Sequence, residues 1–267
     1  MWQNKHFRLR RHPLRRIMAP ALLGILLTGC WARQADPGPE SWADDYMNQA
    51  AKTLAPRSRV CAGPVSERFY ANNGPDYELD LGAGKVGIIG RGSWGALPPI
   101  PSGRSWKAYD ANQSVCAFIH RITVHHTHSR YTIQSLQIYH QNQSDPKADI
   151  AYHFFIDDDG RIYEARPLGF MGSHSEGDNS HNVGIVLNGD FSKKLPDPRQ
   201  ITALRQLLTA LRCPCAPIDG LWTHQQRKGL RYPGAADHYT ACPGQHLAVE
   251  VYGLARELGF ATVTTRP

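Results

Sequence analysis

The chain has 267 residues, 41% of them hydrophobic and 20% charged, which is enough apolar side chain for a packed core in one or two domains. The formal net charge is +7, but residues 1–30 contain six lysines and arginines and no acid, so the remainder carries only +1 (7 − 6). So small a charge argues against the basic face that nucleic-acid binding requires, and we expect no nucleic-acid partner.

Residues 1–29 have the order of a secretion signal, with cationic residues followed by an apolar run over 17–27 that is too short to span a membrane. The run ends in Leu27-Thr-Gly-Cys30, which resembles the lipobox of bacterial lipoproteins. The resemblance implies a lipoprotein signal peptide over 1–29 and a lipid anchor at Cys30; an ordinary secretion signal with a chance cysteine is the alternative. The resemblance also implies a location in the periplasm of a Gram-negative bacterium. Because Trp31 is not the aspartate that the resemblance associates with inner-membrane retention, we favour the outer membrane over the inner.

The five later cysteines would lie in an oxidising compartment, where disulfides persist. Cys213 and Cys215 are only two positions apart, so we expect them to pair with Cys61 and Cys116 rather than with each other. This leaves Cys242 unpaired.

Residues 30–85 show little periodicity and are interpreted as a tether and an N-terminal extension that packs on the following domain. A domain over 86–262 begins with a short strand near residue 86. Further strands are predicted over 117–124, 150–156, 161–165, 182–187 and 218–223, and helices over 132–143, 197–212 and 245–258. The helix over 197–212 has Asp197 as N-cap and Pro198 at its first position. The alternation predicts a single α/β domain with a central mixed sheet flanked by helices.

The strand candidate Ile122-Thr-Val-His125 ends at two adjacent histidines, which is a place where side chains can face a cleft. Strand alternation sends His125 and His126 to opposite faces, so only one of them should face a metal. Partners are available at His224, which ends a strand, and at His238 and Cys242 in the loop before the last helix. Two histidines and a thiolate with a fourth position left open are typical of catalytic zinc. With 13 histidines in the chain, however, a solvated or core role is the simpler interpretation for any single one.

Several ordered motifs resemble the type 2 family of N-acetylmuramoyl-L-alanine amidases, which includes phage amidases and the peptidoglycan recognition proteins. They are Val124-His-His-Thr127, Tyr152-His-Phe-Phe-Ile156, Gly172-Ser-His-Ser-Glu-Gly-Asp-Asn179, Val183-Gly-Ile-Val-Leu-Asn-Gly-Asp-Phe191 and Ala241-Cys-Pro-Gly244. Arg91-Gly-Ser-Trp-Gly-Ala96 also resembles the opening of the recognition-protein branch. The match covers about residues 86–260.

The resemblance implies a zinc cleft on one face of the domain, with His125 and Cys242 as ligands. The second ligand stays open between His224, which is 18 residues before Cys242, and His238, which is four residues before it. We favour His224 because it keeps the family's strand-end position, which makes residues 225–237 an insertion.

The resemblance also implies that Tyr152 lies beside the metal and positions or deprotonates the attacking water, and that Thr240 holds the developing oxyanion. His174, Asn179 and Asn182 fall in the family's His-x-x-Gly-x-Asn region, where cleft and substrate contacts are expected; a structural role in capping the turn is the alternative.

The function implied is zinc-dependent hydrolysis of the amide bond between N-acetylmuramic acid and L-alanine, with Zn²⁺ as cofactor and peptidoglycan or muropeptides as partners. The alternatives are a non-catalytic peptidoglycan-binding lipoprotein of the same fold, and an anchoring lipoprotein whose zinc only staples a loop.

Overall fold

The computed structural model describes residues 67–100, 106–213, 218, 220–236 and 239–261, which all belong to the compact unit of residues 39–267. The predicted signal peptide, Cys30, Cys61, Cys215 and His238 lie outside the described residues. Among the described residues, no helix has both the length and the apolar character needed to cross a membrane.

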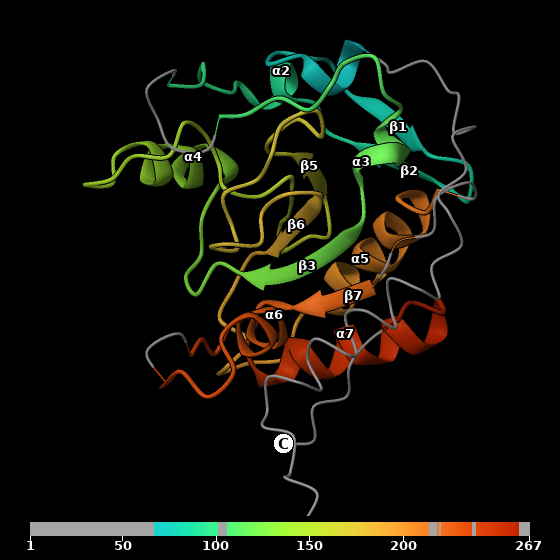
Figure 1. Cartoon of the computed structure of the whole chain (residues 1–267). Helices are drawn as coiled ribbons and strands as arrows, with labels where there is room; N and C mark the ends of the chain where they lie inside the picture. The colour runs from blue at the N-terminus through green and yellow to red at the C-terminus, as the bar shows by residue number, and fades with distance from the viewer. Residues whose placement is uncertain (1–66, 101–105, 214–217, 219, 237–238, 262–267) are drawn as a thin grey trace, which may run out of the picture. The chain divides into compact units, whose positions relative to one another are not determined.

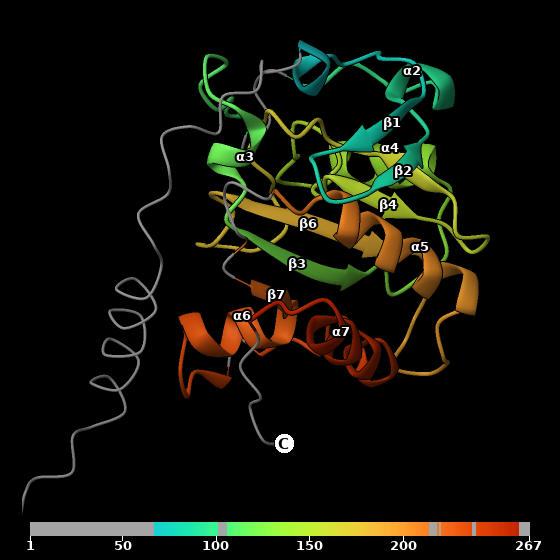
Figure 2. The same cartoon turned by 90° about the vertical axis from the view of Figure 1, so that its right-hand side faces the viewer.

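The centre of the fold is a five-stranded sheet in the order β5-β4-β6-β3-β7 (Figure 1). Its strands are β3 (Arg121–His126), β4 (Phe154–Ile156), β5 (Ile162–Glu164), β6 (Asn182–Leu187) and β7 (Gly220–Thr223). Four of them are parallel, as Figure 2 shows for β3 and β6, and the edge strand β5 runs antiparallel to β4. The predicted α/β domain with a mixed central sheet is therefore confirmed.

Each face of this sheet packs against helices, because side chains alternate along the strands. Phe154 and Ile156 belong to the main core together with side chains of α5 (Pro198–Ala210) and α7 (Gln245–Glu257). Phe155 lies in a second core with Ile133 and Leu136 of α4 (Ile133–Gln141). Figure 1 accordingly shows α4 and α5 on opposite sides of the sheet.

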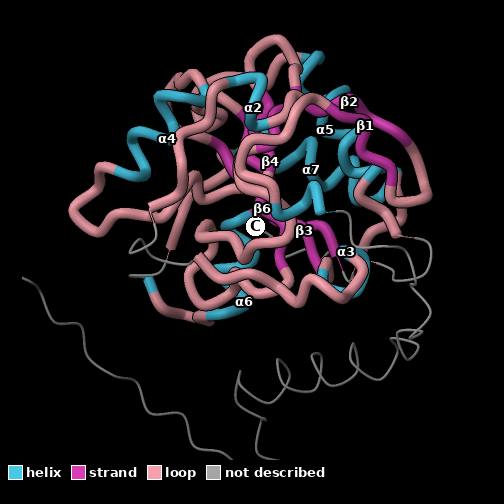
Figure 3. Tube along the Cα trace, turned by 90° about the horizontal axis from the view of Figure 1, so that it is seen from above, coloured by secondary structure: helices cyan, strands magenta, loops and turns pink. Residues whose placement is uncertain are grey.

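The segment before the sheet is short and irregular. It contains a 3₁₀ helix (Glu67–Tyr70), a hairpin of β1 (Tyr77–Asp80) and β2 (Lys85–Ile88), and the one-turn helices α2 (Arg91–Trp94) and α3 (Val115–Phe118). Phe69 and Leu79 are part of the main core, so this segment packs on the domain. Much of the chain between these elements is loop (Figure 3).

The best-predicted elements carry clear local signals. Asp197 caps α5, its side chain accepts a hydrogen bond from the Arg199 backbone, and Pro198 is the first helical residue, as predicted. Thr132 caps α4 with a capping box, and β6 has its predicted limits.

Three predictions of local structure were wrong. Residues 117–124 are not one strand, because Ser114 caps the short helix α3 and β3 begins only at Arg121. Of the strand predicted over 150–156, only Phe154–Ile156 pairs with a neighbour. The predicted loop after residue 223 starts with helix α6 (His224–Arg231). The spacing of Thr223 and Gln226, which form its capping box, is the signal that could have predicted this helix.

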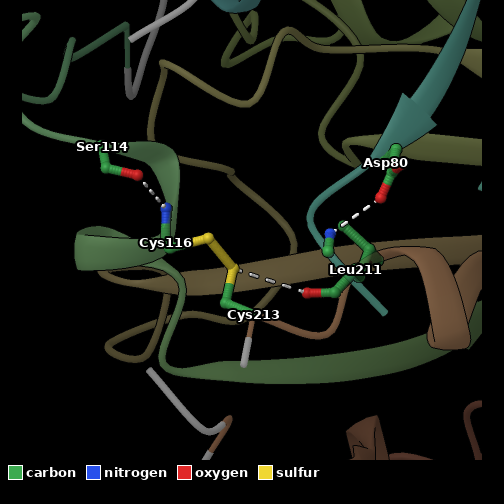
Figure 4. Close-up of a disulfide and its surroundings, with 6 residues drawn as sticks. Asp80, Ser114, Cys116, Leu211 and Cys213 are labelled. Atoms are coloured by element: carbon green, nitrogen blue, oxygen red, sulfur yellow. Dashed lines mark hydrogen bonds between the residues drawn. A yellow bond between two sulfur atoms is a disulfide. The ribbon is translucent and has the colours of Figure 1, made fainter. Parts of the chain in front are cut away.

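A disulfide joins Cys116 of α3 to Cys213 after α5, two residues separated by 97 positions (Figure 4). It agrees with the expectation that Cys213 pairs with Cys61 or Cys116. Cys242 is free, as predicted, and the structure also shows that it is buried.

Candidate functional site

The site lies where β3 and β7 end side by side. These strands are parallel, with Val124 paired to Thr223, so the residues that follow each of them meet at the same edge of the sheet. His125 follows Val124, and His224, the first residue of α6, follows Thr223. The two imidazole ring centroids are 4.5 Å apart. The strand-end position that favoured His224 from sequence thus brings it against His125.

Cys242 reaches this edge from the loop before α7. The backbone N–H of Gln225 donates to the Cys242 carbonyl at 2.8 Å, which ties the loop to the start of α6. The loop then turns at Gly244, where φ is +84° and a Cβ atom would stand 2.3 Å from the Phe191 backbone, so only glycine fits. The Cys242 thiol ends 3.6 Å from His125 Nδ1, across 117 residues of sequence.

The donor set of these three side chains fits a zinc ion. One ligand atom each from His125, His224 and Cys242 can be chosen so that all three lie within 4.8 Å of one another. His224 Nε2 is buried and has no hydrogen-bond partner, a costly state for a polar atom that a bound metal would relieve. Two imidazoles and one thiolate are soft to borderline ligands of the kind that zinc prefers.

Burial sets the protonation states of this group. Desolvation, with the neighbouring His224 and His174, lowers the pKa of His125 well below its usual value. Burial and the Lys228 cation lower the pKa of His224 to about 4. Burial raises the pKa of the Cys242 thiol to about 12. The two imidazoles are therefore neutral at pH 7, as ligands must be, whereas the thiol must lose a proton to bind a metal.

His126 points away from this group, as strand alternation predicted. The Phe191 N–H donates to His126 Nδ1 at 3.2 Å. His126 also groups with His128 and Asp190 in a second cluster. In that cluster the Asp190 carboxylate already pairs with Lys193 at 3.1 Å, and Nδ1 of His126 is engaged by the backbone. The second cluster is thus partly engaged by the chain itself, although His126 Nε2 is buried without a hydrogen-bond partner.

Tyr152 lies beside the three candidate ligands, with its ring centroid 5.0 Å from that of His125. It precedes β4 in a segment that Arg166 holds by donating to the Ile150 carbonyl at 2.8 Å. His153 faces the other way and donates from Nε2 to the Phe170 carbonyl at 2.9 Å. Burial, reinforced by the Cys242 sulfur, raises the pKa of the Tyr152 hydroxyl, which therefore keeps its proton at neutral pH.

Thr240 is two residues before Cys242 and partly buried. Its hydroxyl oxygen accepts a hydrogen bond from the Cys242 backbone N–H at 3.2 Å. The hydroxyl thus lies next to the candidate ligand, although Thr240 is not among the residues that line the cleft described below.

His174 and Asn179 meet in one turn beside the ligands. The Asn179 side-chain oxygen accepts from the backbone N–H groups of His174 and Ser175, at 2.8 and 2.7 Å, which is the turn-capping role considered from sequence. His174 is buried, and its Nδ1 lies 3.0 Å from His125 Nε2. Asn182 is buried at the start of β6, where its side chain binds Thr123 and Asp178.

The candidate site opens onto a cleft with a volume of about 830 Å³. The cleft lies between helix α6 on one side and helix α4 with its flanking residues on the other. His174, His224 and Cys242 line it, as do Tyr152 and Asn179. Sequence reasoning missed other lining residues, which come from α4 and its flanks and from α6: Tyr131, Tyr139, His140, Lys147 and Lys228. A cleft of this volume accommodates a ligand larger than a single amino acid or sugar.

The chain is similar in sequence to known proteins. A family model described as N-acetylmuramoyl-L-alanine amidase matches residues 117–245. Peptidoglycan-recognition protein SC2 of Drosophila melanogaster is 31% identical over 160 residues, which cover 56% of this chain and 81% of that protein.

Two solved structures are also similar. One is the N-acetylmuramoyl-L-alanine amidase LysC from Clostridium intestinale, at 28% identity and a TM-score of 0.46, covering 60% of this chain and 95% of that one. The other is peptidoglycan recognition protein-LE in complex with tracheal cytotoxin, a monomeric diaminopimelic acid-type peptidoglycan. It has 26% identity and a TM-score of 0.49, covering 62% of this chain and 92% of that one.

Proposed function

Because the chain belongs to the family of type 2 N-acetylmuramoyl-L-alanine amidases and peptidoglycan recognition proteins, we propose that it is a zinc-dependent amidase. The bond cleaved joins the lactyl group of N-acetylmuramic acid to L-alanine of the stem peptide. The observation that carries the proposal is the group of His125, His224 and Cys242 at the cleft, with one imidazole nitrogen buried and unpartnered. A fourth position left to the cleft is what distinguishes a catalytic zinc site from a structural one.

The chemistry divides between the ion and the chain. Bound zinc polarises a carbonyl and lowers the pKa of water towards ~7. Tyr152, whose pKa is raised by burial, keeps its proton, so we assign it to orienting the attacking water rather than deprotonating it. Thr240, which accepts from the Cys242 N–H, donates its own proton to the oxyanion that develops on the scissile carbonyl.

The substrate is peptidoglycan or muropeptides, which are large enough to need the open cleft. We place the protein at the periplasmic side of a Gram-negative outer membrane, held by acylation of Cys30 after removal of residues 1–29. The support for this is the lipobox-like Leu27-Thr-Gly-Cys30 behind a cationic apolar leader. Membrane fractionation tests it: Cys30→Ala should move the protein from the membrane to the soluble fraction, and an unchanged distribution would refute the anchor.

The activity is tested by zinc content and by release of stem peptides from purified sacculi. The wild type should bind about one zinc per chain and release peptides, and Cys242→Ser should lose both. Thr240→Val keeps the shape of the side chain but removes the donor. It should retain zinc and release peptides about 10²–10³-fold more slowly, the usual cost of one oxyanion donor. If the wild type binds zinc but releases no stem peptides, the proposed amidase activity is contradicted. A non-catalytic peptidoglycan-binding function would then be the remaining alternative.

A further inference from the structure

Both ring nitrogens of His174 are in hydrogen bonds, and one of these bonds has only one possible direction. His174 Nε2 lies 3.1 Å from the backbone carbonyl oxygen of Asn182, and a carbonyl can only accept. Nε2 of His174 therefore carries the proton, and Nδ1 of the neutral ring carries the lone pair. Nδ1 is 3.0 Å from His125 Nε2, so it accepts a proton from that nitrogen.

This chain of hydrogen bonds determines which nitrogen His125 offers to the cleft. With its proton on Nε2, neutral His125 has its lone pair on Nδ1. That is the nitrogen 3.6 Å from the Cys242 thiol. We propose that His174 is a positioning residue, which holds His125 in the tautomer and orientation that present Nδ1 to a metal ion; the inference rests on the proposed zinc site.

The His174 ring occupies a slot formed by two glycines. A Cβ atom on Gly172 or on Gly184 would stand 2.5 Å from His174 Cδ2, closer than any tolerable contact. Gly184 lies inside β6, where glycine weakens a strand, so the close approach of this ring explains its presence. A side chain at either position would displace the imidazole from its two partners.

The Asn182 carbonyl, which accepts the hydrogen bond from His174, is itself held in place. The Asn182 side chain accepts from the Thr123 hydroxyl at 2.9 Å and donates to the Asp178 carbonyl at 2.8 Å. Thr123 is on β3, two residues before His125, so the carbonyl and the candidate ligand share one rigid sheet. In metal sites, outer partners of this kind orient the ligand, and their loss typically weakens metal affinity by about 10–100-fold.

This role differs from the substrate contact expected from sequence. Although His174 lines the cleft, both of its nitrogens face protein atoms, so neither is left for a substrate. A positioning role therefore predicts an effect on zinc affinity, whereas a substrate contact predicts an effect on turnover alone.

The test compares two substitutions of similar size by zinc competition titration at neutral pH. In His174→Gln, the amide can accept from His125 and donate to the Asn182 carbonyl, so zinc affinity should stay within several-fold of wild type. In His174→Met, neither bond can form, and affinity should fall about 10–100-fold. Cobalt(II) absorption should stay like wild type in the first variant and change in the second.

The outcomes separate this inference from the proposed function. If the wild type binds zinc and His174→Met binds it equally well, with unchanged cobalt spectrum, the positioning role is refuted even where turnover is lost. If the wild type binds no zinc, the proposed function itself fails.

The slot gives an independent pair of variants. Gly184→Ala should weaken zinc binding by displacing His174, and Gly87→Ala is the matched control, since it is also inside a strand but has no atom within 4 Å of the added Cβ. Circular dichroism would establish that both are folded. Equal zinc affinity in the two variants would refute the claim that Gly184 makes room for His174 in its positioning role.

Discussion

At Cys242, burial raises the pKa of the thiol to about 12, while the same cause lowers the pKa of His224 to about 4. These opposite shifts have one origin, because desolvation disfavours the charged form of each group. In the metal-free protein the three candidate ligands are thus uncharged at neutral pH. A metal ion that binds them therefore displaces one proton from the Cys242 thiol, and the thiolate that forms is its charged ligand.

We therefore expect zinc affinity to rise about tenfold per pH unit between pH 6 and 8. In this range the thiol keeps its proton until zinc binds, and both imidazoles are already neutral, so one proton is released per ion. Competition titrations at pH 6, 7 and 8, corrected for protonation of the chelator, measure the slope. An affinity independent of pH would show that Cys242 is not a ligand.

Among the elements, α6 contributes most to the site that sequence patterns did not predict. It carries His224 at its first residue, and Arg227 one turn later forms a bidentate ion pair with Asp178, at 2.6 and 2.8 Å. Both side chains of this pair are about nine-tenths buried, at 12% and 9% exposure, so solvent screens it little. Asp178 precedes β6, and the pair therefore docks α6 against the sheet that carries His125.

Arg227→Met should lower the free energy of unfolding by about 1.5–3 kcal/mol, the usual worth of hydrogen bonds to a charged group. It should also weaken zinc binding, because α6 holds His224. Urea denaturation and zinc titration measure the two effects. Arg231→Met, at the exposed end of the same helix, is the control and should change neither. A zinc affinity unchanged in Arg227→Met would mean that this pair does not position His224.

At the scale of the whole molecule, the domain buries several histidines in neutral form. Besides lowering the pKa of the candidate ligands His125 and His224, burial lowers the pKa of His153 to about 4 and that of His140 to about 3. Each accepts a backbone hydrogen bond at Nδ1, from Gly184 and Ala151 respectively. In the unfolded chain both rings take up a proton near their ordinary value of 6.5.

The unfolded state therefore binds more protons than the folded state between pH 6.5 and about 4, and stability must fall as pH falls through this window. Each such histidine contributes about 1.4 kcal/mol per pH unit to the slope. Urea denaturation of zinc-free protein at pH 7, 6, 5 and 4.5 measures it. His153→Gln removes one titrating group and should make the slope shallower. If the free energy of unfolding did not change between pH 7 and pH 4.5, the proposal that these rings are buried in neutral form would be contradicted.

Sequence patterns predicted the elements whose signals are local. The Asp197-Pro198 start of α5, the capped helix α4 and the apolar strand β6 needed only nearby residues. The prediction failed over residues 117–124, because Ser114 caps the short helix α3, whose last residues overlap the start of the predicted strand. Cys116 of this helix is bonded to Cys213, 97 positions away, a contact that neighbouring residues do not indicate.

At the site, the amino-acid sequence shows which residue types are present and in what order: histidines at two strand ends and a cysteine before the last helix. It could not decide how they meet, because side-chain proximity depends on strand order and register, which non-local packing sets. In the folded chain, the parallel pairing of β3 with β7 places His224 against His125, and the Cys242 thiol lies 3.6 Å from His125 Nδ1. The hydrogen bond between His174 and His125 could likewise not be predicted from the sequence motif. It depends on the Asn182 carbonyl, which belongs to a neighbouring strand and holds the other nitrogen of His174.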